Sequence, residues 1–191
     1  SFVAGAGNEE TSVMVTGKYY FSDEPEFPEY YEDEYKWYKE NYRTRGEVLK
    51  NPFFDSIITL PEIYEYNTPT TAYFYNAKVN LKNVQVGFTR NFESHNTSIG
   101  GKPEFNIYTA EAKYEVVNQI SYISHDFISD NNKWNVTSTF SHSFFELAPE
   151  SKFMNTFTKY DKAYKYATSS KFKLDEQISY QLTEKLQAMA G

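Results

Sequence analysis

Three stretches of the chain alternate apolar and polar residues with the period of two that is typical of β-strands. In the first stretch, Val13, Val15, Tyr19 and Phe21 fall on one face, and Ser, Thr and Lys residues fall on the other. The second stretch is the longest and has a break at Asn83. The three stretches are residues 12–21, 71–90 and 134–145.

Weaker strand signals occupy the segments between these stretches. Residues 55–60 form a short apolar run that ends at Pro61, and residues 106–128 are long enough for two further strands. The segment 130–133 (DNNK) has the composition of a turn. It predicts an antiparallel hairpin between the strands on either side.

A helical pattern is present in residues 30–42. Its four tyrosines are spaced at i, i+4, i+7 and i+11, which places their rings on one stripe of a helix. Acidic residues crowd the first turn and lysines follow, as the helix dipole favours. The tyrosines are Tyr31, Tyr35, Tyr38 and Tyr42, and Trp37 flanks their stripe.

Two patterns near the end of the sequence also favour helices. Residues 149–162 follow a helical spacing that begins at Pro149, after which a strand is predicted to residue 174. Residues 175–190 are predicted to form an amphipathic helix with Asp175 as its N-cap. Its apolar stripe consists of Leu174, Ile178, Leu182, Leu186 and Met189.

These elements predict an α+β fold in one domain spanning residues 1–191. We expect an antiparallel sheet of about seven strands with two or three helices packed on one face, because short turns join most strands. The alternative is an all-β sandwich with a terminal helix. The proline-rich residues 22–34 are predicted to form an acidic loop.

Composition narrows the functional classes. The chain has no cysteine, which excludes disulfides and zinc–thiolate sites within it. Aromatic residues make up 19% of the chain. The formal net charge is −7, and residues 1–40 carry all of that imbalance. A negative charge of this size disfavours nucleic acid as a partner, because phosphate binding needs positive charge.

No catalytic, cofactor-binding or metal-binding constellation is recognisable in the sequence. The histidines His95, His125 and His142 are not spaced as metal ligands, and His142 shares a predicted strand face with Phe140 and Phe144, which predicts a structural role. Neither a nucleophile elbow nor a phosphate-binding glycine loop is present. We therefore predict a non-enzymatic chain without a cofactor.

The tyrosine stripe supports two interpretations. It is either the buried face of a helix on the sheet or a recognition surface formed by Tyr31, Tyr35, Trp37, Tyr38 and Tyr42. A buried face normally contains Leu, Ile and Val, which need no hydrogen-bond partner. A wet recognition surface suits tyrosine, whose ring packs while its hydroxyl stays hydrated.

The resulting functional hypothesis is a binding or assembly domain of an exported protein that recognises a protein or a glycan. The predicted location is the bacterial envelope, periplasmic or outer-membrane-associated, or secreted, and a cytoplasmic location stays open. No segment resembles a transmembrane helix, so we expect any membrane tether to lie before Ser1. The alternative function is a glycan-acting hydrolase with paired carboxylates. Asn96 and Asn135 begin glycosylation sequons.

Overall fold

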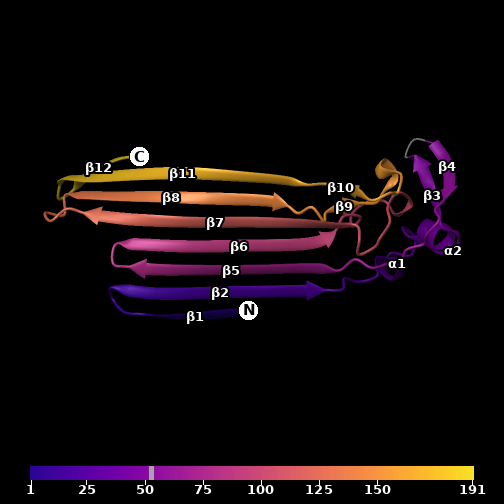
Figure 1. Ribbon diagram of the computed structural model, residues 1–191, viewed down its shortest axis with the longest axis horizontal. Helices are drawn as coiled ribbons and strands as arrows, with labels where there is room; N and C mark the ends of the chain where they lie inside the picture. The colour runs from indigo at the N-terminus through magenta and orange to yellow at the C-terminus, as the bar shows by residue number, and fades with distance from the viewer. Residues whose placement is uncertain (52–53) are drawn as a thin grey trace.

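A computed structural model describes residues 1–51 and 54–191 of the chain. Eight strands form one antiparallel sheet in the order β1-β2-β5-β6-β7-β8-β11-β12 (Figure 1). The strands are β1 (Phe2–Gly7), β2 (Thr11–Ser22), β5 (Thr70–Leu81), β6 (Val84–Asn96), β7 (Lys113–Ile128), β8 (Trp134–Leu147), β11 (Ala167–Thr183) and β12 (Leu186–Ala190). Neighbours in the sheet are therefore neighbours in sequence, apart from the excursions between β2 and β5 and between β8 and β11.

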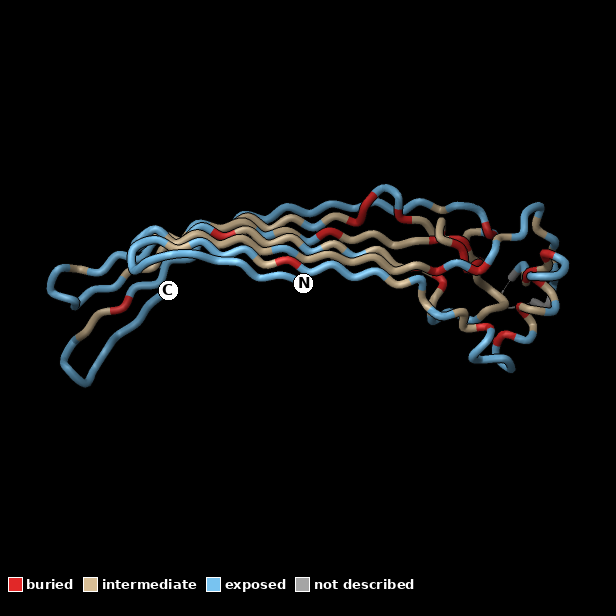
Figure 2. Tube along the Cα trace, turned by 90° about the horizontal axis from the view of Figure 1, so that it is seen from below, coloured by how far each residue is buried: buried red, intermediate tan, exposed pale blue. Residues whose placement is uncertain are grey.

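The large sheet is a single layer. Figure 2 shows it nearly edge-on, with exposed and half-buried residues along most of its length and most buried residues gathered at one end. In β11, for example, Ser179 is the one buried residue of the strand. An extended sheet with both faces uncovered cannot derive its stability from a conventional core, so the ladder of backbone hydrogen bonds and cross-strand side-chain pairs dominates.

The connections differ sharply between the two ends of the sheet. At one end the strands are joined by the short segments 8–10, 82–83, 129–133 and 184–185. At the other end they are joined by the long segments 23–69, 97–112 and 148–166. These three segments fold together into a compact unit, which we call the head (Figure 1).

The head contains short helices and two small hairpins. Its helical elements are α1 (Phe27–Tyr30), η1 (Tyr38–Tyr42), α2 (Arg43–Arg45), η2 (Pro103–Phe105) and η3 (Thr156–Thr158). Its strands are β3 (Glu47–Asn51), β4 (Phe54–Thr59), β9 (Lys152–Phe153) and β10 (Ala163–Tyr164). Within the described ranges, no helix is both long enough and apolar enough to cross a bilayer.

The predicted α+β fold is wrong. No layer of helices covers the sheet, and the longest helical segment, residues 36–45, lies in the head. The sandwich alternative also differs from the structure, because the eight strands form one layer and the residues expected to form the terminal helix belong to β11 and β12. The sequence contained the strands but no signal that both faces of the sheet would lack a covering layer.

The predicted C-terminal helix at residues 175–190 is also wrong. These residues continue β11 and turn into β12, and β11 pairs with β8 from Ala167↔Leu147 to Tyr180↔Trp134. Leu174, Ile178 and Leu182 are spaced by four residues, which fits a helix face and a strand face equally well. The long pairing with β8 decides between the two. The helix expected at residues 149–162 is replaced by β9, η3 and irregular backbone.

Several local predictions are confirmed. The alternating stretch 12–21 lies in β2, the break at Asn83 separates β5 from β6, and residues 130–133 lie in the turn between β7 and β8. Residues 106–128, however, contain one long strand rather than two. The segment 106–112 is drawn into the head, where Ile107, Tyr108 and Ala112 are buried.

Tyrosine rings form most of the core of the head. Tyr38 packs edge-on against Tyr108 with ring centroids 5.5 Å apart and stacks on Tyr42 at 5.2 Å. Tyr66 stacks on Tyr108, also at 5.2 Å. Offset and edge-on aromatic pairs of this kind add stability beyond their buried area. The buried cluster consists of Tyr35, Tyr38, Tyr42, Val48, Tyr66, Ile107, Tyr108, Ala112, Met154 and Tyr160.

The core tyrosines differ in how their hydroxyls are satisfied. The Tyr160 hydroxyl donates to the Leu49 carbonyl at 2.6 Å, and the Tyr42 hydroxyl accepts from the Tyr64 backbone N–H at 2.9 Å. The Tyr38 hydroxyl is buried and has no hydrogen-bond partner in the described part of the chain. An unpaired buried hydroxyl carries a desolvation cost, whereas a paired one contributes to stability.

This difference predicts opposite effects of the same conservative change. Tyr38→Phe should leave the stability of the head unchanged or raise it, because it removes an unpaired hydroxyl. Tyr160→Phe should lower the free energy of unfolding by about 0.5–1.5 kcal/mol, because the Leu49 carbonyl loses its donor. Tyr38→Ala should cost about 3–5 kcal/mol through the cavity it leaves. Urea unfolding of the three variants measures this, and a loss of stability in Tyr38→Phe as large as in Tyr160→Phe would contradict it.

Candidate functional site

The structure divides the predicted tyrosine recognition surface between the core and the solvent. Tyr35, Tyr38 and Tyr42 are buried in the head, whereas Tyr31 is 53% exposed and Trp37 is half-buried. Three of the four stripe tyrosines are therefore buried, but in the core of the head and not against the sheet as the buried-face interpretation expected. A recognition role stays a prediction for Tyr31 and Trp37 only.

Burial changes the acidity of the core phenols. Desolvation raises the pKa of Tyr42 and of Tyr160 to about 12, and it raises the pKa of Tyr38 and Tyr108 still further. Neighbouring phenols add to the shift of Tyr38 and Tyr108, because a second phenolate nearby would repel the first. These shifts come from packing, and they mark a structural core and not a catalytic group.

The eight-stranded sheet has one predominantly apolar face. The register aligns one row of side chains across six strands, and every member of that row is apolar. All of them are exposed except Val79, which is half-buried. The row consists of Val13, Val79, Val86, Ile123, Phe140 and Leu174. We call this side of the sheet the apolar face.

The rows next to this one mix apolar and polar residues, with His125, Ser138 and Glu176 in the row towards the short turns. Beyond that row, Phe127, Val136 and Ile178 are aligned, followed by the paired rings of Trp134 and Tyr180 at 4.4 Å. Towards the head, the apolar face ends in a row that contains Tyr19, Tyr73 and Phe92, with the rings of Tyr73 and Phe92 stacked at 4.8 Å. An apolar band thus runs along the strands with aromatic rings at both ends.

The opposite side of the sheet, the polar face, carries mostly Ser, Thr, Asn, Gln and Lys. Its side chains bond across strands: Asn80 Nδ2 donates to Ser12 Oγ at 2.8 Å and Gln85 Nε2 donates to Asn80 Oδ1 at 2.9 Å. The hydroxyls of Ser124 and Thr139 lie 2.8 Å apart. These hydrogen bonds lie in the half of the sheet nearer the short turns, on a face that also carries the exposed apolar residues Met14, Ile120 and Ile128.

Polar residues that interrupt the apolar face have partners on neighbouring strands. Arg90 Nη1 donates to Gln119 Oε1 at 3.2 Å, and Ser138 Oγ donates to Glu176 Oε2 at 2.6 Å. A ring nitrogen of His142 lies 2.7 Å from Ser170 Oγ, and the imidazole stacks on Phe172. These pairs reduce the cost of placing polar groups among apolar ones.

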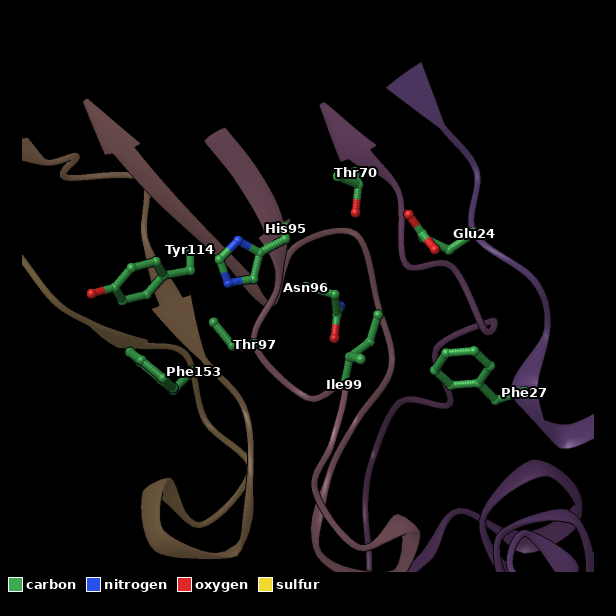
Figure 3. Close-up of a pocket in the computed structure, with 9 residues that line it drawn as sticks. All are labelled: Glu24, Phe27, Thr70, His95, Asn96, Thr97, Ile99, Tyr114 and Phe153. Carbon is green, nitrogen blue, oxygen red and sulfur yellow. The ribbon is translucent and has the colours of Figure 1, made fainter. Parts of the chain in front are cut away.

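A pocket of about 390 Å³ lies where the sheet meets the head (Figure 3). Its walls come from the end of β6, the start of β5, the start of β7, β9 and the segment that follows β2. The lining residues are Glu24, Phe27, Thr70, His95, Asn96, Thr97, Ile99, Tyr114 and Phe153. By register, Thr70, His95 and Tyr114 belong to the polar face, so the pocket lies at the head end of that face.

Sequence reasoning missed this pocket. Its residues are scattered from position 24 to position 153, and no spacing motif connects them. Alternation within β6 and β7 would have shown that His95 and Tyr114 each lie on a definite face. Only the register between the two strands shows that they are opposite each other.

The adjacent residues His125 and Asp126 lie on opposite faces of the sheet, His125 on the apolar face and Asp126 on the polar face. No cluster of three potential metal ligands occurs in residues 1–51 and 54–191.

The two glycosylation sequons differ in accessibility. Asn96 is buried: its Nδ2 donates to the Thr109 carbonyl at 2.7 Å, and its Oδ1 accepts from the Ser98 N–H. Asn96 is therefore inaccessible to glycosylation in the folded chain, whereas Asn135 is exposed.

Comparisons with known proteins found no match: no family model, no curated protein and no solved structure matches the chain.

The raised phenol pKa values predict that the buried tyrosines ionise late in an alkaline titration. Tyr42 and Tyr160 should ionise near pH 12, above the ordinary phenol pKa of about 10. Because the folded-state pKa is above the unfolded one, the stabilisation is complete below about pH 10 and is lost as the pH rises towards about 12. Absorbance at 295 nm, recorded together with circular dichroism, measures both events. A single ionisation step near pH 10 without unfolding would contradict a buried tyrosine core.

Proposed function

We propose that this protein is an exported cell-envelope protein whose eight-stranded sheet lies in a lipid bilayer and whose head is a binding unit at one membrane surface. The observation that carries the proposal is the separation of the sheet into an apolar and a polar face. One row of apolar residues is continuous across six strands, and further exposed apolar residues lie on the same face on either side of it. Contiguous apolar surface of large extent is rare on proteins surrounded by water.

The dimensions of the strands support a bilayer as the occupant of the apolar face. A strand that crosses the hydrocarbon layer needs about 9–11 residues when tilted. The six central strands have between 12 and 17 residues each. Each strand is therefore long enough to cross the hydrocarbon layer. Trp and Tyr are enriched where hydrocarbon meets water, and Trp134, Tyr180 and Tyr73 lie at the ends of the band, with further rings such as Phe140 and Phe172 between them.

The distribution of polar groups also supports a bilayer. One face can contact hydrocarbon only if the other keeps its polar side chains hydrated or paired, as the polar face does. The edge strands β1 and β12 have backbone groups without partners in this sheet. In hydrocarbon such groups must be satisfied, so we expect both edges to pair with further strands.

The arrangement of loops supports a binding role at the head end. The short connections place little protein beyond one end of the sheet, whereas the head forms a folded unit at the other. Its exposed aromatic residues Tyr31 and Phe157 and its pocket are available to a protein or glycan partner. The pocket lining includes one carboxylate, Glu24, and this favours binding over the two-carboxylate hydrolase.

A matched pair of arginine substitutions tests the proposal. Phe140 lies on the apolar face and Ser141, its neighbour in β8, on the polar face. With the protein inserted in phosphatidylcholine vesicles, Phe140→Arg should lower the free energy of unfolding by about 2–4 kcal/mol, because the charge faces hydrocarbon. Ser141→Arg should stay within about 0.5 kcal/mol of the parent.

Urea unfolding followed by far-ultraviolet circular dichroism gives both values. Equal losses in the two variants would refute the assignment of faces. Failure of the parent protein to associate with vesicles, combined with formation of a stable dimer in water, would show that a second copy covers the apolar face instead.

A further inference from the structure

The pocket between the sheet and the head has walls of two chemical kinds. Phe27 forms one side, and Tyr114 and Phe153 form the other, with their rings edge-to-face at 6.2 Å (Figure 3). The imidazole of His95 lies between these sides, 5.5 Å from the Tyr114 ring. Glu24 and Thr70 also line the pocket and are drawn above Phe27 in this view.

Two polar side chains of the pocket wall, Asn96 and Thr97, form hydrogen bonds that hold the surrounding loops in place. Thr97 Oγ1 lies 3.1 Å from the carbonyls of both Ala112 and Lys152, and the Asn96 amide is bonded at both its oxygen and its nitrogen. These interactions tie the loop after β6 to β9 and to the segment before β7. They give the pocket a fixed shape before any ligand arrives, as is usual for small-molecule sites.

Two other polar side chains of the lining are less committed. The Nδ1 atom of His95 is buried, lies 3.4 Å from Glu93 Oε1 and makes no hydrogen bond in the part of the chain that the structure describes. The half-buried Glu24 carboxylate has no hydrogen bond or ion pair among the described residues. The Glu24 backbone N–H donates to Ser22 Oγ at 3.0 Å, and this holds the residue at a φ of 54°.

We propose that this pocket binds a neutral, polyhydroxylated ligand of mono- or disaccharide size. Glu24 accepts hydrogen bonds from ligand hydroxyls, and His95 and Thr70 act as donor or acceptor. The rings of Phe27, Tyr114 and Phe153 pack against the C–H surfaces of the ligand. The pocket volume of about 390 Å³ lies within the range of small-molecule sites, about 300–1,000 Å³.

The charges around the pocket favour a neutral ligand over an ionic one. The Lys165 ammonium lies 5.8 Å from the centre of the Phe153 ring, so a cation against that wall would meet a positive charge. Glu24 would in turn repel an anion. Because hydroxyl groups bond to a carboxylate and to an imidazole alike, a polyol can bond to Glu24 and to the other ring nitrogen of His95 at once.

This proposal is independent of the lipid contact proposed above, because the pocket is built by the loop ends of the strands and not by the apolar face. Failure of one proposal leaves the other standing. The register places the pocket on the polar face of the sheet, so it stays open to water when the apolar face is covered.

Binding of defined sugars to the full protein tests the proposal. The probes are D-glucose, D-galactose, N-acetyl-D-glucosamine and maltose, with tetramethylammonium and inorganic phosphate as ionic comparisons, and saturation-transfer NMR measures binding. At least one sugar should bind, and Glu24→Gln should weaken it about tenfold or more, because a charge-assisted hydrogen bond becomes a neutral one. Glu29→Gln, an exposed neighbour in the same acidic segment, should bind as the parent does.

A second variant keeps the test decisive if Glu24→Gln fails to fold. Tyr114→Leu retains apolar volume but removes the flat ring, and it should also reduce sugar binding about tenfold while circular dichroism stays unchanged. Binding of no sugar, equal sugar binding in parent and variants, or Glu24-dependent binding of tetramethylammonium alone would each overturn the proposal.

Discussion

The alignment of side chains across paired strands is the constraint on which this structure depends. In an antiparallel sheet, residues directly opposite each other point to the same side, so a shift of one residue exchanges the two faces. From β2 to β11, the register keeps one complete row of apolar residues aligned, from Val13 to Leu174, and on the other side it brings polar pairs such as Ser12 and Asn80 together. The sheet therefore acquires two chemically different faces without any second layer to distinguish them.

The head and the sheet of this chain treat their apolar side chains differently. The head buries its rings and leaves some hydroxyls unpaired, as at Tyr38 and Tyr66, so close packing outweighs complete hydrogen bonding there. The sheet leaves apolar side chains uncovered, with Leu174 and Phe172 about two-thirds exposed. The head thus has a buried core of its own and the sheet has none, and this contrast is the reason for proposing a bilayer as the occupant of the apolar face.

The sequence was informative about strands and uninformative about what covers them. Alternation located β2, β8 and the hairpin around residues 130–133, because that signal is local. The same local reasoning failed at residues 175–190, where a spacing of four residues fits helix and strand alike and the partner strand β8 decided. The pocket escaped prediction because Glu24, His95 and Phe153 meet only through strand register and loop packing, and the buried tyrosines resembled a surface because their composition is unusual for a core.

The lipid contact of the apolar face is the central claim of this account, and the absence of cysteine makes it directly measurable. Single cysteines placed in turn at positions 119 to 127 of β7, each labelled with an environment-sensitive fluorophore, report the surroundings of every side chain in vesicles. Odd-numbered positions should be quenched by nitroxide-labelled lipid and even-numbered positions by aqueous iodide, a period of two along the strand. Iodide quenching at every position, with no alternation, would contradict the claim.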